Sequence, residues 1–338
     1  MALAKVGTNV VMVCRSRSKC QAAQRQIFQE LTDKNIRGGK VRIMTMDTSS
    51  LASVRTFCQE YIANMGDKPN NHAQTIDMIF MNAGTNFFRP KVDDDQKNNK
   101  NCAPKTKEDG IEYLFQVNYL GHHLMYRLLE PYLASQARIV HTTSASSFAT
   151  FSYKVATDLE TLHGCSEPYL KGPLDENLSY GQSKLAQILW CKALTRKLLN
   201  NGNTNDNNRN MIIANSYHPG LVDTPIVDKM IKNSTVAQWA VRVLKGYVMP
   251  NAWKSPDGAL TGLYLASEHV IKKNIQGEYF HPQAQRMVNP LSLDEQLQDN
   301  LWEFSDQLVR DFLEPITRPT MEEEDTVSPE TENQATVQ

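Results

Sequence analysis

Short apolar runs alternate with longer segments of helical periodicity along this chain, and this alternation restricts its fold more than any other feature. Apolar runs of this length are too short for helices and predict buried strands, here at 9–14, 41–46, 76–81, 138–143 and 211–216, with a last strand at 277–280. Periodicity and capping residues predict helices at about 16–31, 51–62, 111–133 and 180–200. Strands that alternate with helices favour a parallel sheet covered on both faces.

The composition excludes several classes of partner. Lysine and arginine total 36 and aspartate and glutamate 37 in 338 residues, a formal charge of -1. This balance does not favour nucleic acid or an anionic membrane surface. The six cysteines lie scattered, with no CxxC pair and no Cys/His cluster, and predict a reduced, intracellular, metal-free protein. No apolar run reaches the ~18 residues of a transmembrane helix.

Two polar segments stand apart from this alternation. Residues 93–109 are rich in asparagine, lysine and aspartate and predict a solvated loop insertion. Residues 317–338 contain a run of four acidic residues and almost nothing apolar, which is typical of a disordered acidic tail. We therefore expect a single doubly wound α/β domain over 1–316, followed by the tail.

Tyr180 and Lys184 stand four positions apart, so on a helix they share one face. An isolated phenol titrates near pH ~10, and a neighbouring cation favours the phenolate and lowers that pKa. A tyrosine tuned in this way exchanges a proton with an alcohol or a ketone near neutral pH. Taken alone, such a pair is more often an exposed helical pair than a catalytic one, so its meaning depends on the rest of the chain.

Further candidate residues fall where the predicted strands end. They are Arg15 after the first strand, Asp47 after the second, Asn82, Ala83 and Gly84 after the third, Ser144 after the fourth and 219–224 after the fifth. A turn or capping role is the default for any one of them. Because ligands of parallel sheets bind beyond the carboxyl ends of the strands, the convergence of all of them predicts a ligand site.

The histidines do not predict a metal centre. His122 and His123 are adjacent on a helix and cannot both face one metal, so we interpret them as ordinary core or surface histidines. His218 is interpreted as shaping the backbone before Pro219 rather than as a chemical group.

These signatures together resemble the short-chain dehydrogenase/reductase family, over about residues 1–313. The motifs that match are Met46-Asp47, Asn82-Ala83-Gly84, Asn118 within 117–122, Ser144, Tyr180 with Lys184, and Pro219-Gly220. Segments 47–55, 180–186, 218–220 and 301–305 resemble the retinol dehydrogenase and WW-domain oxidoreductase branch. Protochlorophyllide reductase is a related branch, which the carboxyl-terminal third fits less well.

The resemblance implies a Rossmann-like fold and an enzyme that interconverts a carbonyl and an alcohol. Tyr180 would pass its proton to the substrate oxygen, and Ser144 would donate a hydrogen bond to that oxygen and stabilise its charge. Lys184 would lower the pKa of Tyr180 and hydrogen-bond the nicotinamide ribose. Asn118 would hold a water that links Lys184 to solvent.

The resemblance also assigns residues to an NADP(H) cofactor. Arg15 sits where the family selects the 2′-phosphate, which a guanidinium suits, with Arg17 and Lys19 beside it; a carboxylate at this position would have favoured NAD. The other residues expected at the cofactor are Asp47 and Thr48 at the adenine, Asn82, Ala83 and Gly84 along the adenosine, Tyr180 and Lys184 at the ribose, and Pro219, Gly220, Val222 and Thr224 at the nicotinamide and pyrophosphate.

The amino terminus departs from the family pattern. The family begins with a strand and a glycine-rich turn well before the position of Arg15, and here residues 1–7 resemble the end of the helix that follows this turn. The missing strand would be central, between 9–14 and 76–81, and its absence would leave two inner edges without partners. We expect a truncated form of an active enzyme; a catalytically impaired binding or scaffold protein, and a rearranged terminus that still binds cofactor, remain alternatives.

Apolar positions between Val236 and Tyr247 follow helical spacing, which core packing explains as well as a ligand pocket does. In the family this region covers the substrate, so the resemblance implies a lipophilic substrate such as a retinoid, a steroid or a long aldehyde. Residues 151–178 are expected to form a loop over the site. The sequence leaves open the direction of reaction, a homo-oligomeric state, and a cytoplasmic or organelle-membrane location.

Overall fold

The computed structural model describes residues 1–65, 75–86, 104–150, 158, 162, 175–201, 212–222 and 252–316. The residues expected to form the lid helix at 236–247 and the acidic tail at 317–338 lie outside the described residues, as do Thr224 and most of the insertion at 93–109.

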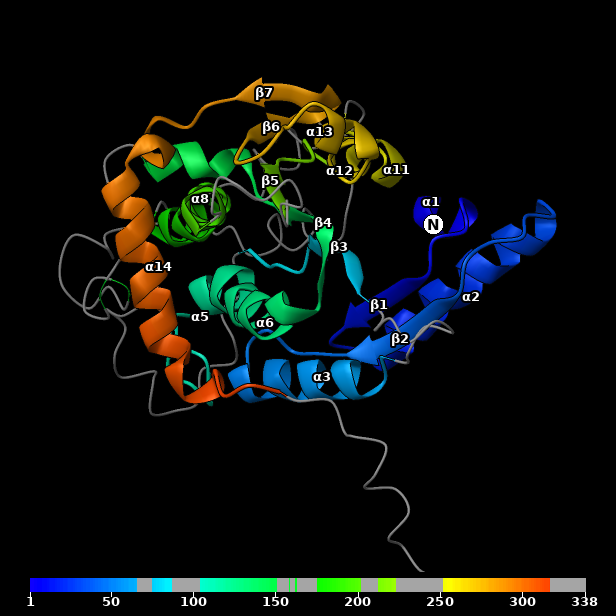
Figure 1. Ribbon diagram of the computed structural model, residues 1–338, viewed down its shortest axis with the longest axis horizontal. Coiled ribbons are helices and arrows are strands. Elements are labelled where there is room, and N and C mark those ends of the chain that lie inside the picture. The colour runs from blue at the N-terminus through cyan, green and yellow to red at the C-terminus, as the bar shows by residue number, and fades with distance from the viewer. Residues whose placement is uncertain are drawn as a thin grey trace, which may run out of the picture.

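The elements follow the predicted alternation of strands and helices (Figure 1). The strands are β1 (Val10–Cys14), β2 (Val41–Thr45), β3 (Ile76–Met81), β4 (Leu133–Thr142), β5 (Ile213–Tyr217), β6 (Tyr279–His281) and β7 (Gln285–Met287). The helices are α1 (Ala2–Lys5), α2 (Arg17–Asp33), α3 (Leu51–Ala63), α5 (Tyr113–Phe115), α6 (Gly121–Leu129), α8 (Asp175–Asn201), α11 (Ser255–Gly258), α12 (Leu260–Leu265), α13 (Glu268–Lys272) and α14 (Glu295–Val309), with a π-helical segment at Gln116–Leu120.

The strands form two separate sheets rather than one. β1 pairs with β2, and β3, β4, β5, β6 and β7 form a second sheet in that order. All the neighbours are parallel except β6 and β7, which are antiparallel. The chain moves outward from β1 to β2 and then returns to β3 on the other side of β1, so the direction of winding reverses between β1 and β3. Ligands of doubly wound sheets bind at such a reversal.

β1 differs from the prediction of a buried strand. Its sequence is Val-Val-Met-Val-Cys, yet all five residues are only half-buried. β5 has the sequence Ile-Ala-Asn-Ser-Tyr, and all five of its residues are buried. β5 has a hydrogen-bonded neighbour on each side, whereas β1 has one described neighbour, β2. The neighbours of a strand therefore decide its burial here more than its own hydrophobicity does.

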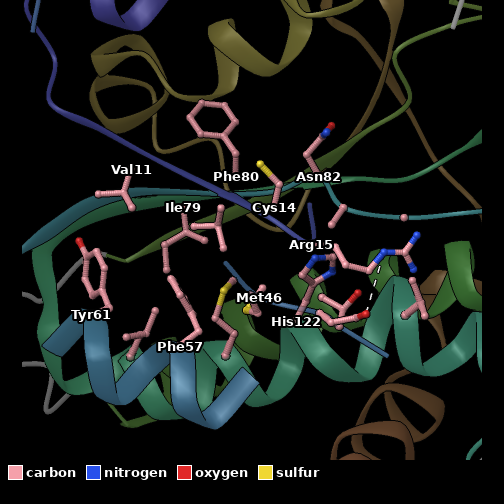
Figure 2. Close-up of a pocket in the computed structure, with 18 of the residues that line it drawn as sticks. Val11, Cys14, Arg15, Met46, Phe57, Tyr61, Ile79, Phe80, Asn82 and His122 are labelled. Carbon is pink, nitrogen blue, oxygen red and sulfur yellow. Dashed lines mark ion pairs between the residues drawn. The ribbon is translucent and has the colours of Figure 1, made fainter. Parts of the chain in front are cut away.

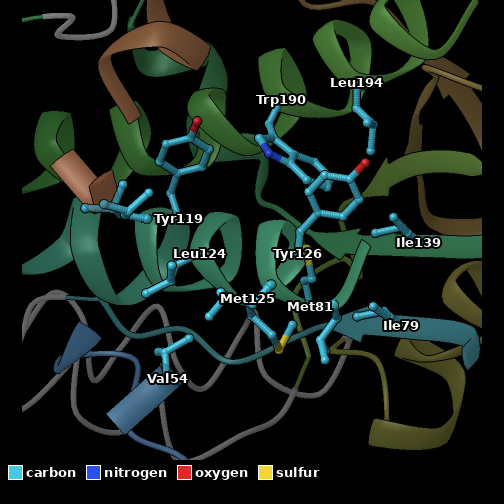
Figure 3. Close-up of a cluster of buried hydrophobic side chains, with 14 of the residues drawn as sticks. Val54, Ile79, Met81, Tyr119, Leu124, Met125, Tyr126, Ile139, Trp190 and Leu194 are labelled. Carbon is cyan, nitrogen blue, oxygen red and sulfur yellow. The ribbon is translucent and has the colours of Figure 1, made fainter. Parts of the chain in front are cut away.

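The main core lies between the five-stranded sheet and helices α3, α6, α8 and α14 (Figure 3). Trp190 on α8 packs edge-on against Tyr126 on α6, with ring centroids 5.0 Å apart, and stacks on Trp302 of α14 at 6.0 Å. Helix α14 is also fixed by polar contacts, since Asp306 accepts hydrogen bonds from Arg127 and, at 2.8 Å, from His123 Nε2. The segment 301–305, one of the branch signatures, thus closes the core over α6 and α8.

Several local features correct the sequence predictions. The helix expected to reach Leu133 ends at Leu129, because Pro131 lies in a 3-10 turn that leads directly into β4. The hairpin partner β7 was not predicted, and it adds an antiparallel edge to a sheet expected to be parallel. Cys14 and Cys20 form a disulfide with Cα atoms 6.3 Å apart, whereas reduced cysteines were expected.

Candidate active site

The sheet topology brings most of the predicted residues to the carboxyl edge of the strands. A cavity of about 590 Å³ opens there between the two sheets (Figure 2). Its lining includes Arg15, Asp47, Thr48, Asn82, Ala83 and Gly84, which are the residues expected along the adenine and adenosine of a cofactor. Residues far apart in the sequence therefore share one concave surface.

Ser144 and Tyr180 meet at this edge. Ser144 follows β4, where its hydroxyl oxygen accepts a hydrogen bond from the Ser146 amide at 3.2 Å. Tyr180 lies in the amino-terminal part of α8, and a hydrogen bond joins its side chain to that of Ser144. The Tyr180 ring also packs against the apolar cluster formed by Tyr113, Leu114 and Val117. The two hydroxyl groups are thus close enough to act on one substrate oxygen.

Lys184 is buried beside them and does not have the electrostatic effect that the sequence predicted. Its Nζ lies 5.5 Å from the centroid of the Tyr180 ring and donates a hydrogen bond to the Thr142 carbonyl at 3.1 Å. Burial lowers the pKa of Lys184 to about 7. Burial also raises the pKa of Tyr180, and the hydrogen bond to Ser144 opposes this only in part. The prediction that Lys184 lowers the tyrosine pKa is therefore wrong for this structure, since desolvation of the phenol dominates.

Asn118 occupies the middle of the π-helical segment and is completely buried. Its side chain accepts a hydrogen bond from the Thr85 amide at 2.7 Å and donates one to the Thr85 carbonyl at 3.0 Å. Its own carbonyl oxygen accepts from Gln187 at 2.7 Å and bonds His122 at 3.0 Å. Asn118 therefore joins the loop after β3 to helix α8, and its expected role of holding a water stays a prediction.

Gly84 explains why this loop can lie so close to α8. A Cβ atom at residue 84 would stand 3.1 Å from the Asn118 side-chain oxygen and 3.4 Å from Lys184 Nζ. A larger residue would therefore push against two of the candidate catalytic side chains. Neighbouring Asn82 and Ala83 are exposed at the cavity, and Asn82 accepts a hydrogen bond from the Thr142 hydroxyl at 3.0 Å.

At the other end of the cavity, Arg15 follows β1 and Asp47 follows β2. The Arg15 side chain is 66% exposed, and its Nε stands 4.0 Å from one Asp47 oxygen. The other Asp47 oxygen accepts hydrogen bonds from the amide and the hydroxyl of Ser49, at 2.9 and 2.6 Å. Asp47 is thus held in place by the turn before α3, while the described residues leave most donors of the Arg15 guanidinium available.

The segment after β5 packs against Trp253 and against His281 of β6. Gly220 has a φ of +85°, and a Cβ atom there would stand 2.7 Å from the Trp253 ring, so both conformation and space require glycine. Val222 pairs with Trp253 in a parallel bridge. His218 packs edge-on against His281 with ring centroids 5.4 Å apart, and burial lowers its pKa to about 4.

The two adjacent histidines have separate surroundings. His122 bonds the Asn118 carbonyl and packs edge-on against buried His141. His123 accepts a hydrogen bond from the Trp190 indole at 3.0 Å and faces Asp306. Within the described ranges, no three His, Cys, Asp or Glu residues are placed to hold a metal ion. Both histidines are therefore accounted for as core residues.

The residues that position the candidate groups were not predicted from the sequence. Thr142 holds Lys184 through its carbonyl and Asn82 through its hydroxyl, and the Thr143 hydroxyl donates to the Lys184 carbonyl at 2.7 Å. Ser183 accepts from Asn118 at 2.9 Å. Their place in the sequence was a usable signal, because Thr142 and Thr143 directly precede Ser144 and because Ser183 lies three positions after Tyr180.

Comparison with known proteins now places the chain in a family. The short chain dehydrogenase family matches residues 1–156. Retinol dehydrogenase 14 of Mus musculus is 30% identical over 324 residues, which cover 91% of this chain and 80% of that protein. The chain belongs to the short-chain dehydrogenase/reductase family and is an oxidoreductase of its retinol dehydrogenase branch. Members of the family use NAD or NADP.

Solved structures agree on the fold. An uncharacterized protein from Mycobacterium paratuberculosis has a TM-score of 0.58 at 23% identity, with 91% of this chain and 86% of that chain covered. L-sorbose reductase from Gluconobacter frateurii, solved with NADPH and L-sorbose, has a TM-score of 0.55 at 16% identity, with 85% and 89% covered. Among the described residues, no helix combines the length and apolarity needed to cross a bilayer.

Proposed function

We propose that the protein is an NADP(H)-dependent oxidoreductase that interconverts a carbonyl and an alcohol on a lipophilic substrate such as a retinoid, a steroid or a long aldehyde. The observation that carries this proposal is the meeting of the Ser144 and Tyr180 hydroxyls beside buried Lys184. Three residues from two distant segments converge at the carboxyl edge of the sheet, next to a cavity of about 590 Å³. A purely structural role would not require this combination.

The protonation states suit acid-base work on a substrate oxygen. Because its pKa is raised, Tyr180 carries its proton at neutral pH and can donate it to a carbonyl oxygen, which favours the reducing direction. Ser144 can donate a hydrogen bond to the same oxygen as charge develops. Lys184, with a pKa of about 7, exchanges protons near neutral pH and is suited to resupply Tyr180. A bound nicotinamide nucleotide supplies or accepts the hydride.

Arg15 supports the preference for NADP. Its exposed guanidinium lines the cavity, and its ion pair within the described part of the chain is a long contact with Asp47, which leaves most of its donors for a phosphate. Arg17 opens helix α2 and Lys19 follows in its first turn, so two further cations lie close by in the sequence. Asn82, Ala83 and Gly84 line the same cavity, which supports their proposed contact with the adenosine.

The preference for a lipophilic substrate has two supports. The Tyr180 ring lies against the apolar cluster of Tyr113, Leu114 and Val117, and Tyr113 and Val117 also line the cavity. The relative Retinol dehydrogenase 14 is named for an apolar alcohol. A small polar carbonyl would gain little from such surroundings.

The split sheet favours one alternative, a catalytically impaired form that acts as a binding or scaffold protein. The candidate nucleotide residues Arg15 and Asp47 follow the two-stranded sheet, while Ser144, Tyr180 and Lys184 belong to the five-stranded one. If the two sheets do not hold a fixed relative position, the catalytic residues will be intact and the cofactor will bind weakly.

The test is to titrate the purified chain with NADPH and with NADH, and then to assay retinal, a steroid ketone and a long aldehyde beside glyceraldehyde. We expect tighter binding of NADPH and turnover of the apolar carbonyls. Arg15→Glu should weaken NADPH at least tenfold and change NADH little, whereas Arg25→Glu on the exposed side of α2 is the matched control. Turnover of glyceraldehyde alone would refute the lipophilic substrate, and failure to bind either nucleotide would support the impaired form.

A further inference from the structure

The turn that carries Ser144 is short and has few bonds of its own. A 3-10 helix at Ala145–Thr150 follows Ser144 directly. The Ser147 amide donates to the Ser144 carbonyl at 3.1 Å, and the Ser146 amide donates to the Ser144 hydroxyl oxygen at 3.2 Å. Hydrogen bonds in 3-10 turns have poorer geometry than those in α-helices, so such a turn holds its shape weakly by itself. The position of the Ser144 hydroxyl therefore depends on contacts from other parts of the chain.

One such contact comes from Asn289, which lies 142 positions after Ser147. Its side-chain Nδ2 donates a hydrogen bond to the Ser147 carbonyl at 3.0 Å, and the residue is only 1% exposed. Its Oδ1 accepts from the Leu291 amide at 3.1 Å and so caps the short 3-10 helix Pro290–Leu293. The two ends of this side chain thus have separate tasks, because the oxygen serves its own segment and the nitrogen serves the turn after Ser144.

Asn289 is itself anchored to the main core. The Ser292 hydroxyl donates to the Asn289 carbonyl at 2.6 Å, and the Gln298 side chain on α14 donates to the Ser292 carbonyl at 2.8 Å. Arg196 on α8 donates to the side-chain oxygen of Gln298 at 3.2 Å. Helix α14 runs beside α8 (Figure 1), so these bonds tie Asn289 to the helix that also carries the other candidate catalytic residues.

A second contact reaches the same turn from β6. Phe148, which follows Ser147, packs against the rings of Tyr279 and His281, with ring centroids 6.1 Å apart in each case. Ring packing fixes the general place of the turn. A hydrogen bond depends on direction as well as distance. Asn289 is therefore better suited than Phe148 to set the orientation of the turn.

We propose that Asn289 is a positioning residue for Ser144. This inference rests on the proposed function, since it concerns the group expected to stabilise the substrate oxygen. By holding the Ser147 carbonyl, Asn289 fixes the turn and thereby the place of the Ser144 hydroxyl relative to Tyr180. Donors to a developing charge act through geometry that is set before the reaction, so a turn that had to reorganise would lose part of their effect.

The test is a double-mutant cycle of Asn289→Ser and Ser144→Ala in the full chain, assayed with NADPH and with retinal or the long aldehyde, whichever is turned over faster. Serine also caps helices, but its side chain is too short to reach the Ser147 carbonyl. Ser144→Ala should lower kcat by roughly 10²–10³-fold. Asn289→Ser should lower kcat by roughly tenfold with KM nearly unchanged, and should cause no further loss when Ser144 is already alanine.

A second measurement needs no turnover. Residue-resolved hydrogen exchange of the Ser146 and Ser147 amides reports whether the turn is held, and Asn289→Ser should speed their exchange by roughly tenfold. Asn300→Ser, the same change at an exposed position on α14, is the matched control and should alter neither exchange nor kcat. If Asn289→Ser fails to fold, Asn289→Asp takes its place, because aspartate keeps the size and the capping oxygen while its ionised carboxylate cannot donate.

The outcomes separate this inference from the proposed function. Unchanged exchange of the Ser146 and Ser147 amides in Asn289→Ser would overturn the inference alone, and so would losses in kcat that simply multiply when the two changes are combined. Wild-type turnover in Ser144→Ala would refute the role of Ser144 in the proposed function and this inference with it. If the chain turns over none of the carbonyls, the exchange measurement still decides whether Asn289 holds the turn.

Discussion

The two sheets of this molecule carry different parts of the candidate site and are stabilised to different extents. The five-stranded sheet holds Ser144 and Lys184 in a core where Val140 and Leu185 are fully buried. The two-stranded sheet holds Arg15 and Asp47, and its inner strand β1 is half-buried throughout. The residues proposed to carry the chemistry therefore lie beside a firmly packed sheet, whereas those proposed to select the nucleotide follow a less firmly packed one.

The largest expected effect separates chemistry from nucleotide binding. Tyr180→Phe removes the proton donor and should lower kcat by roughly 10²–10⁴-fold, with little change in the affinity for NADPH. Tyr264→Phe, the same change on α12 away from the site, is the control. Steady-state kinetics and nucleotide titration check the prediction. Comparable turnover in the Tyr180 variant would remove the catalytic assignment from the five-stranded sheet.

A matched pair of core substitutions measures the difference in packing directly. Val140→Ala in β4, where the side chain is fully buried, should cost about 2 kcal/mol through lost burial and a cavity. Val13→Ala in half-buried β1 should cost about 1 kcal/mol or less, because less apolar surface is lost. Urea denaturation of both variants gives the two free energies of unfolding. Equal losses would contradict the comparison between the sheets.

The smallest effect concerns the charge on Lys184. Its pKa is lowered to about 7 in the folded protein, so between this value and its ordinary value near ~10.5 the unfolded chain binds more protons. The free energy of unfolding of the wild type, relative to Lys184→Met, should therefore rise with pH, by about 1 kcal/mol between pH ~7.5 and ~8.5.

Urea denaturation at the two pH values measures this change, and Lys40→Met, at an exposed lysine just before β2, controls for the loss of a lysine. A difference between wild type and Lys184→Met that does not change with pH would show that Lys184 is better solvated than the structure indicates.

The sequence located the first three strands well because each of these apolar runs has a polar or turn-forming boundary, whereas β4 begins at Leu133, before the expected 138–143. The run 76–81 coincides with β3, and 9–14 and 41–46 match β1 and β2 within a residue. It could not predict how deeply β1 is buried, because burial depends on a neighbour that the local pattern does not specify. The hairpin strand β7 was not predicted, because its sequence Gln-Arg-Met has no apolar pattern.

The sequence predicted that Ser144, Tyr180 and Lys184 would lie together, but it did not predict the pKa of Tyr180. Spacing placed Tyr180 and Lys184 on one helix face, and the structure brings Ser144 to them. The direction of the tyrosine pKa was wrong, because the i,i+4 rule gives proximity and says nothing about desolvation. Likewise, nothing in the local pattern predicted that Asn118 would be held by Thr85 and Gln187, since both lie far from it in the chain.

The π-helical segment Gln116–Leu120 has a further consequence for the whole molecule. Such a segment contains one residue more than an α-helix of equal length, so everything after it is turned by about 100° relative to an uninterrupted helix. Removing a single residue there would restore ordinary winding and turn α6, in which every residue but Arg127 is buried, by the same angle within its packing. The extra residue thus sets the rotation of α6 relative to the turn that contains Asn118. A chain without it could not keep both the hydrogen bonds of that turn and the present packing of α6.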